Sequence, residues 1–206
     1  MRCKSIEDEK KHLSTNPIMK FVLKKFKQDI IETASMAFPQ NILDVGCGNG
    51  FITKEIAKAF PNSKITAVDI EQEKIDYAKR HNNAHNVKYL QGNMFHLPFK
   101  KNSFDLVICN EVLEHLADYN KAINILAGLS SRYLLVSVPN EPLFRIATFM
   151  RGKHLRTWGN MPGHVNNWNK RQIVNLLKPH GGIIKVLTST VWNIVLIKKN
   201  EAKHGL

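Results

Sequence analysis

Residues 41–50 contain the pattern with the clearest chemical use in this sequence. An apolar run ends at Asp44-Val45 and is followed by glycines at three alternate positions. An apolar run that stops at a glycine-rich turn predicts a strand that reverses into a helix. Glycine lets a ligand approach the backbone closely, and the N-terminus of a helix offers unpaired N–H groups. The turn is therefore predicted to hold a ligand, through Asp44, Gly46, Cys47, Gly48, Asn49 and Gly50.

The glycine spacing separates this turn from a dinucleotide-binding turn. Dinucleotide sites use G-x-G-x-x-G, whereas the spacing here is G-x-G-x-G and the next residue is Phe51. The next apolar run ends at Asp69, about twenty residues on, where a ribose-binding carboxylate belongs. Together with Asp44, these features resemble the S-adenosylmethionine (SAM) site of the class I methyltransferases, in particular their small-molecule branch.

The resemblance implies SAM as the cofactor and indicates further binding residues. In that family the glycine turn wraps the methionine part of SAM, and the acid after the second strand binds the ribose hydroxyls. Asn93 stands where the family often has an Asp that contacts the adenine amino group, and the asparagine side-chain oxygen can accept the same bond. Besides the turn, the residues expected to bind SAM are Asp69, Ile70, Asn93, Met94 and Asn110.

Residues 110–116, Asn-Glu-Val-Leu-Glu-His-Leu, follow the fourth predicted strand and again resemble the small-molecule branch. In related quinone-pathway O-methyltransferases and small-RNA 2′-O-methyltransferases, a similar E-x-x-E-H segment helps to bind a divalent metal, together with a histidine from downstream. Here that histidine would be His164, with His154 as the second choice. One hypothesis is therefore a site for an ion such as Mg²⁺, formed by Glu111, Glu114, His115 and His164.

A second hypothesis for this segment needs no metal. Glu111 and His115 would line the acceptor pocket, and Glu114 would neutralise the start of a helix. His115 or His164 would then be the general base, because imidazole titrates near neutral pH. The expected catalytic residues are Glu111, His115 and His164.

The elements that must position these residues alternate between strand and helix, which predicts a parallel sheet covered on both faces. Strands are predicted at 41–45, 64–69, 87–90, 104–109 and 132–138, and helices at 50–60, 71–82, 117–129 and 169–178. Apolar runs at 183–187 and 191–197 follow Gly181-Gly182 and resemble the family's closing hairpin. The resemblance thus implies an α/β, doubly wound, Rossmann-like domain with a seven-stranded sheet in the order 3-2-1-4-5-7-6, the last strand antiparallel.

An N-terminal helix is predicted to start at Asn16-Pro17, with Asn16 as its cap and apolar residues at helical spacing among lysines. Such a helix usually packs on the domain and can cover the cofactor, although a basic amphipathic helix can also lie on a membrane surface. The chain of 206 residues fits one domain. Its expected parts are a helical extension (1–40), a SAM-binding core (41–138), and a substrate-side insert with the closing hairpin (139–206).

The net charge of +13 is unevenly distributed along the chain. Residues 41–141 contain eleven basic and eleven acidic side chains, whereas residues 142–206 contain eleven basic side chains and one acidic. This imbalance favours an anionic partner, such as nucleic acid, anionic lipid or a phosphorylated small molecule, or else a basic surface kept for solubility. Within the insert, Arg145, Arg151 and Arg156 are expected to contribute to function and Trp168 to the core.

Other sequence features concern the compartment. No apolar run approaches the ~20 residues that a membrane span needs, and residues 1–11 have no signal-peptide core. A cytoplasmic protein is therefore expected. The three cysteines indicate neither a disulfide framework nor a zinc site, and Cys47 is interpreted as a small residue that fits the turn rather than as a reactive thiol.

Together these features favour a SAM-dependent methyltransferase that acts on oxygen in a small-molecule or lipid-linked acceptor. The main alternative is an RNA methyltransferase of the 2′-O type, with or without metal assistance, which the basic C-terminal part and the E-x-x-E-H segment favour. An alternative of another class is a SAM-binding regulatory or partner protein without turnover. The sequence determines neither the acceptor nor the oligomeric state, since a fold and a cofactor do not fix the substrate.

Overall fold

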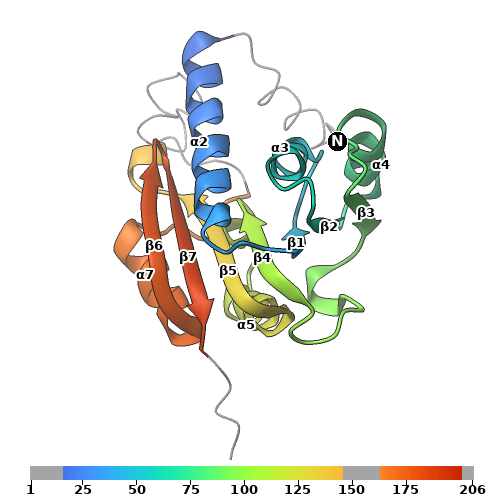
Figure 1. The fold of residues 1–206 in the computed structure, drawn as a ribbon. Helices are drawn as coiled ribbons and strands as arrows, with labels where there is room; N and C mark the ends of the chain where they lie inside the picture. The colour runs from blue at the N-terminus through green and yellow to red at the C-terminus, as the bar shows by residue number, and fades with distance from the viewer. Residues whose placement is uncertain (1–15, 146–162, 201–206) are drawn as a thin grey trace, which may run out of the picture.

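One seven-stranded sheet organises the computed structural model of the chain (Figure 1), which describes residues 16–145 and 163–200. The strands are β1 (Asn41–Val45), β2 (Lys64–Asp69), β3 (Val87–Gln91), β4 (Phe104–Asn110), β5 (Ser130–Pro139), β6 (Gly181–Ser189) and β7 (Trp192–Lys199). Their order across the sheet is β3-β2-β1-β4-β5-β7-β6, and β7 is antiparallel to both of its neighbours. The predicted Rossmann-like architecture is thereby confirmed.

Helices cover both faces of this sheet. They are α2 (Pro17–Ser35), α3 (Phe51–Ala59), α4 (Gln72–His81), α5 (Tyr119–Leu129) and α7 (Lys170–Leu177). One apolar layer contains side chains of α2 and α3, and the layer on the other face contains side chains of α5 and α7. Along β4, Leu106 and Ile108 belong to the first layer, while Val107 and Cys109 belong to the second. This alternation is what a strand buried on both sides requires.

Helix α2 begins where the sequence predicts and packs on the sheet. Asn16 Oδ1 accepts hydrogen bonds from the backbone N–H groups of Ile18 and Met19, at 2.9 and 3.2 Å, which gives partners to two donors that a helix start leaves unpaired. Farther along, the ring of Phe26 lies 4.5 Å from that of Trp192 at the start of β7, and both side chains are buried. Neither α2 nor any other described helix is long and apolar enough to cross a membrane.

The carboxyl ends of strands β1 to β5 lie along one edge of the sheet, because these strands are parallel. The segments that leave this edge include 46–50 after β1, 70–71 after β2, 92–93 after β3 and 111–118 after β4. Ligands of open α/β sheets bind beyond this edge. The fold therefore gathers all four segments that the sequence predicts to contact SAM.

The closing hairpin differs in one detail from the sequence expectation. Gly181 and Gly182 do not precede strand β6 but form its first two residues. A Cβ atom at Gly181 would lie 2.3 Å from the carbonyl oxygen of Lys198 in β7, while a Cβ at Gly182 would meet nothing within 4 Å. Gly181 is therefore required by close approach of two backbones and not by a turn.

We expect Gly181→Ala to lower the free energy of unfolding much more than Gly182→Ala does. Overpacking typically costs about 1–3 kcal/mol, and a backbone contact as short as that at Gly181 should lie at or above the upper end. Gly182→Ala, at the neighbouring open position, is the matched control and should change the free energy of unfolding little. Urea denaturation of the two variants measures the difference, and equal midpoints would contradict the explanation.

Candidate functional site

The turn between β1 and α3 has the backbone conformation that its glycines predict. Gly46, Gly48 and Gly50 have positive φ angles of 77°, 55° and 77°. Space is also restricted there, because a Cβ atom at Gly46 would lie 2.3 Å from Cγ2 of Val112, in the segment after β4. The backbone of Gly46 thus packs directly on the side chain of Val112. Because the glycines carry no side chains, a ligand can approach the backbone of the turn closely.

Asp69, the last residue of β2, holds this turn in place. Its Oδ2 accepts a hydrogen bond from the N–H of Gly48 at 2.8 Å, and its Oδ1 accepts one from the N–H of Glu71 at 3.0 Å. A carboxylate has about four lone-pair positions, so two hydroxyl donors could still bind. The neighbouring Ile70 is 60% exposed, which leaves an apolar surface beside the carboxylate.

Asp44, the fourth residue of β1, is buried beneath the turn. Its Oδ2 accepts a hydrogen bond of 2.6 Å from the hydroxyl of Thr53, in the first turn of α3. Burial raises the pKa of Asp44 to about 6, the Thr53 hydrogen bond opposes this rise, and the charge of Asp69 adds to it. The two predicted carboxylates differ in environment, since Asp44 is paired with the Thr53 hydroxyl of α3, whereas Asp69 accepts the N–H of Gly48 in the turn and that of Glu71.

Asn49 and Cys47, the other two predicted residues of the turn, also contribute to its packing. Asn49 is fully buried, and its carbonyl oxygen accepts a hydrogen bond of 2.7 Å from Asn82, whose own carbonyl accepts one of 3.0 Å from the hydroxyl of Tyr89. Burial and the nearby carboxylates of Asp44 and Asp69 raise the pKa of the Cys47 thiol well above its ordinary value. This agrees with the interpretation of Cys47 as a small, unreactive residue.

The segment after β3 contributes one exposed and one buried residue. Asn93 is exposed and accepts a hydrogen bond of 3.0 Å from the N–H of Phe95, which caps a short 3₁₀ helix at Met94–His96. One lone pair of the Asn93 oxygen stays available for a further donor. Met94 is only 8% exposed and belongs to the apolar core.

Asn110, at the end of β4, presents a buried donor at the carboxyl edge. The Ser137 hydroxyl of β5 donates a 2.9 Å hydrogen bond to Asn110 Oδ1 and so fixes the orientation of the amide. The amide nitrogen Nδ2 of Asn110 is buried and has no hydrogen-bond partner among the described residues. A buried unpaired donor typically costs about 1–3 kcal/mol, which a ligand that accepts this bond would recover. The glycine cradle, Asp69 and this donor together fit SAM by their chemistry.

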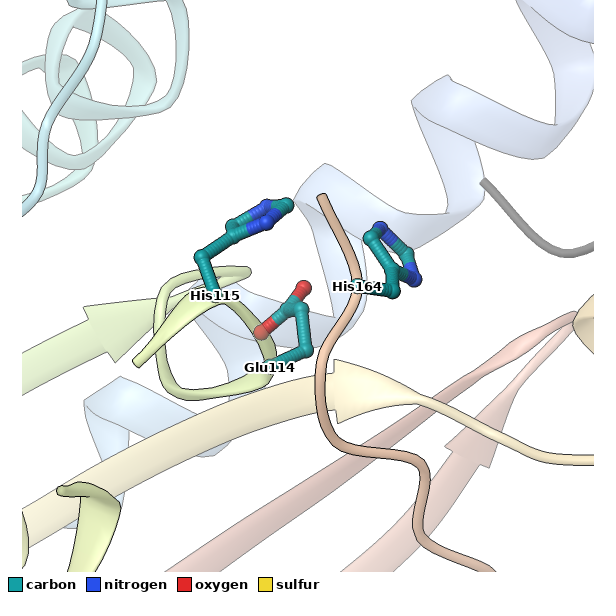
Figure 2. A group of neighbouring side chains, drawn as sticks. All are labelled: Glu114, His115 and His164. Carbon is teal, nitrogen blue, oxygen red and sulfur yellow. The ribbon is translucent and has the colours of Figure 1, made fainter. Parts of the chain in front are cut away.

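A second group of side chains joins the segment after β4 to the segment before α7 (Figure 2). The ligand atoms of Glu114, His115 and His164 lie within 4.8 Å of one another, and Figure 2 shows the carboxylate of Glu114 between the two imidazole rings. The rings of His115 and His164 meet edge to face, with centroids 4.9 Å apart. Glu114 is buried, whereas His115 is exposed. The structure thus brings together the two histidines that the sequence analysis paired across almost fifty residues.

Backbone contacts hold these two segments together. His115 Nδ1 lies 2.9 Å from the carbonyl oxygen of Gly163, and the carbonyl oxygen of Glu114 accepts hydrogen bonds from the N–H groups of Val165 and Asn166 at 2.9 and 3.1 Å. A carbonyl oxygen can only accept, so His115 donates from Nδ1, and in the neutral ring the lone pair lies on Nε2. This tautomer is the form of imidazole that can take a proton or bind a metal.

Glu111 is not a member of that group. The described residues whose ligand atoms lie within 4.8 Å are Glu114, His115 and His164 alone. Glu111 instead has a positive φ of 53°, and its N–H donates a 3.0 Å hydrogen bond to the carbonyl oxygen of Ser137. A left-handed backbone at a residue other than glycine is uncommon and is concentrated at functional sites.

Several predicted residues of the insert lie outside the described residues, namely His154, Arg151 and Arg156. Trp168 is described and only 8% exposed, and its ring packs edge-on against Tyr119 with centroids 5.2 Å apart. Its predicted place in the core is confirmed.

Comparisons with known proteins agree with this architecture. The sequence profile of the family described as "Methyltransferase domain" matches residues 39–203. The chain belongs to the class I SAM-dependent methyltransferases. It is 30% identical to a malonyl-[acyl-carrier protein] O-methyltransferase of Bacillus cereus, over 80% of this chain and 61% of that one. It is 34% identical to a ubiquinone biosynthesis O-methyltransferase of Coxiella burnetii, over 60% of this chain and 63% of that one.

The fold of this class I methyltransferase is also close to that of a solved structure. Magnesium protoporphyrin IX methyltransferase from Synechocystis PCC 6803, crystallised with bound SAH, superposes with a TM-score of 0.73 at 18% identity, over 96% of this chain and 94% of that one. The chain spans less than two thirds of the length of its malonyl-[acyl-carrier protein] O-methyltransferase relatives, between 29% and 61%.

Sequence reasoning missed several residues that support the site of this methyltransferase. Thr53 and Ser137 each orient a predicted binding residue through one hydroxyl hydrogen bond. The Gly163 carbonyl fixes the tautomer of His115, and the ring of Phe144 stacks on His164 with centroids 5.7 Å apart. Only Thr53 carried a local signal, since it lies one turn into the helix that follows the glycines. The others act from distant parts of the chain.

We expect Asp44→Asn to remove a pH dependence from the stability of the SAM-free protein. The folded-state pKa of about 6 lies above the ordinary 3.8, so the stabilisation from this carboxyl is present below about pH 4 and is lost as the pH rises through 6. Asn keeps the acceptor for Thr53 but does not ionise. The variant should match wild type near pH 4 and be more stable near pH 8 by up to roughly 3 kcal/mol. Urea denaturation at both pH values is the measurement, and parallel profiles would refute this account.

Proposed function

We propose that this chain transfers a methyl group from SAM to an oxygen atom of a small-molecule or lipid-linked acceptor. The observation that carries the proposal is the His115 imidazole, whose Nδ1 donates to the Gly163 carbonyl so that Nε2 can accept a proton beside the buried Glu114. A hydroxyl acceptor must lose its proton during methyl transfer, and an oriented neutral imidazole can take it.

On the cofactor side, the proposal assigns SAM to the carboxyl edge of β1 to β4. When bound, SAM supplies an electrophilic methyl group on a sulfonium. The backbone of the glycine turn would hold the methionine part, Asp69 the ribose hydroxyls, Ile70 and Asn93 the adenine, and Asn110 Nδ2 an acceptor atom of the ligand. Met94, in the core, would support this surface from beneath. The positive φ angles of the turn and the two backbone bonds of Asp69 support these roles.

On the acceptor side, His115 would be the base and His164 its partner. The edge-to-face contact of the two rings and the stacking of His164 on Phe144 restrict both side chains. The nearby Glu114 carboxylate would stabilise the imidazolium that forms when His115 takes the proton. Glu111, with its left-handed backbone, would orient the acceptor from the same segment.

A metal-assisted variant of this chemistry is the second candidate. One carboxylate and two imidazoles are donors that suit a divalent first-row ion better than Mg²⁺. Their ligand atoms lie within 4.8 Å of one another, whereas two ligands at about 2.1 Å from one ion are at most about 4.2 Å apart, so the three side chains would have to close slightly around it. When bound, such an ion would lower the pKa of an acceptor hydroxyl. Glu114, His115 and His164 would hold it, and Glu111 would not.

The names of the relatives support oxygen as the accepting atom. The relatives from Bacillus cereus and Coxiella burnetii are both named as O-methyltransferases, one for a carrier-bound malonyl group and one for ubiquinone biosynthesis. Neither name concerns RNA, so the RNA alternative gains nothing from them. A regulatory protein without turnover would bind SAM and release no SAH with any acceptor.

For the cofactor, Asp69→Asn should weaken SAM binding by about 10- to 100-fold. The variant loses charge-assisted hydrogen bonds from the carboxylate to the ribose hydroxyls and to two backbone N–H groups. Asp105→Asn is the matched control. Asp105 also accepts two backbone N–H groups, those of Gln40 and Asn41 at 2.9 Å, but it lies at the start of β4. Titration calorimetry measures both variants. Equal affinity in the two would remove Asp69 from the site, and no binding to wild type would reject the proposal.

For the acceptor side, His115→Ala should lower kcat by about 10²- to 10⁴-fold while SAM binding is retained. His85→Ala is the control, since His85 is an exposed histidine that precedes β3 at the opposite edge. SAH release is followed with a panel of carrier-bound acids, catechols and short RNAs, before and after treatment with a chelator. Loss of turnover on chelation, restored by Mn²⁺, would favour the metal-assisted variant. If the His115→Ala variant turns over as fast as wild type, His115 is neither the general base nor a ligand of a metal that turnover requires.

A further inference from the structure

The N-terminal half of α2, residues 17–28, combines exposed apolar side chains with lysines. Ile18 is 75% exposed and Phe21 is 67% exposed, although both are large apolar residues. The same half contains Lys20, Lys24, Lys25 and Lys27 and no acidic residue. The first acid of the helix, Asp29, is buried and paired with Lys25. This half of the helix is therefore both apolar and strongly cationic on its outer surface.

The arrangement around the helix places Phe21 between cationic side chains and Ile18 at one end of the same arc. At 100° per residue, the exposed positions follow one another around α2 in the order Lys20, Lys24, Pro17, Gln28, Phe21, Lys25 and Ile18. The opposite face is fixed, because Leu23, Phe26 and Ile30 are buried against the sheet. Packing thus holds the mixed apolar and cationic face toward the outside.

This half of α2 projects beyond the edge of the sheet that carries the site. Phe26 packs on Trp192, the first residue of β7, which pairs with Pro139 at the carboxyl end of β5. From Phe26 back to Pro17 the helix rises by about 13 Å, at 1.5 Å per residue. Figure 1 accordingly shows the upper part of α2 extending past the tip of β6.

Ring contacts and a cation link α2 to both halves of the site. Trp192 also contacts Phe144 at 6.2 Å, and Phe144 stacks on His164 at 5.7 Å. On its other side, Lys27 Nζ lies 6.0 Å from the ring centroid of Phe51, the first residue after the glycine turn. The exposed half of α2 therefore continues from residues that contact both the glycine turn's helix and the His164 side of the site.

We infer that the N-terminal half of α2 binds the surface of an anionic lipid bilayer. Insertion of Phe21 and Ile18 between headgroups and attraction of Lys20, Lys24 and Lys25 to negative charge are the two contributions that an interfacial helix combines. A polyanion such as RNA would use the lysines but has no use for the exposed aliphatic side chain of Ile18 beside them. In this orientation the outer face of α2 lies on the bilayer and the carboxyl edge of the sheet lies beside it, so a lipid-linked acceptor could reach the site from the membrane surface; this last point rests on the proposed function.

Vesicle co-sedimentation of the full chain tests the inference. The probes are vesicles of phosphatidylcholine alone and vesicles with equal parts of phosphatidylglycerol. Wild type should bind only the anionic vesicles, and added salt should reduce the binding, since salt screens exposed charges. The double variant Ile18→Glu, Phe21→Glu should bind the anionic vesicles with an affinity at least about tenfold lower than that of wild type.

Phe38→Glu is the matched control for this double variant. Phe38 is 82% exposed but follows the C-terminal end of α2, just before β1. It should bind anionic vesicles like wild type. SAM affinity and the thermal midpoint should be unchanged in all variants, which separates this test from the proposed function. Absence of vesicle binding by wild type, equal loss with Phe38→Glu, or a lysine-dependent shift of RNA without vesicle binding would each overturn the inference.

Discussion

The candidate site depends on how the carboxylate of Asp69 accepts two backbone N–H groups. One belongs to Gly48 in the turn after β1, and the other to Glu71 at the start of α4. Within the turn, the N–H of Gly50 donates to the carbonyl oxygen of Cys47 at 3.0 Å, and the N–H of Gly48 finds its partner in the Asp69 carboxylate. Parallel pairing of β1 with β2 brings Asp69 to the level of the turn, and the carbonyl of Val68 accepts from Gly46 and Cys47 beside it. Sheet register, in other words, determines the geometry of a loop.

The other half of the site is assembled by a different principle. Residues 163–166 return to the segment after β4 and dock on it through main-chain hydrogen bonds to Glu114. Asn166 extends this contact, because its amide donates to the carbonyl oxygen of Leu116 at 2.7 Å. The pairing of His115 with His164 is thus a property of two loops, whereas the SAM-facing half is a property of strands. This difference agrees with the common observation that substrate specificity is determined by loops on a constant scaffold.

The division between loops and strands also explains what the sequence could predict. Strands β1 and β2 begin and end where their apolar runs do, and the spacing from Asp44 through the glycines to Asp69 identified the binding edge. Gly181-Gly182 was misplaced because glycine is required both by turns and by close backbones, and the sequence does not distinguish the two. Glu111 was grouped with Glu114 by motif, while its left-handed backbone sets it apart. Ser137 and Gly163 act through one atom each from distant parts of the chain, and a single hydroxyl or carbonyl there leaves no pattern.

The buried carboxyl of Asp44 has a consequence for the energetics of turnover. Its pKa of about 6 lets it bind or release a proton near neutral pH, so its charge can respond to whatever occupies the turn. SAM has a positive sulfonium that SAH lacks. The cationic cofactor would favour the ionised carboxyl, and the neutral product would favour the protonated one. Exchange of product for fresh cofactor would then release a proton to solvent, and product inhibition would weaken as the medium becomes more alkaline.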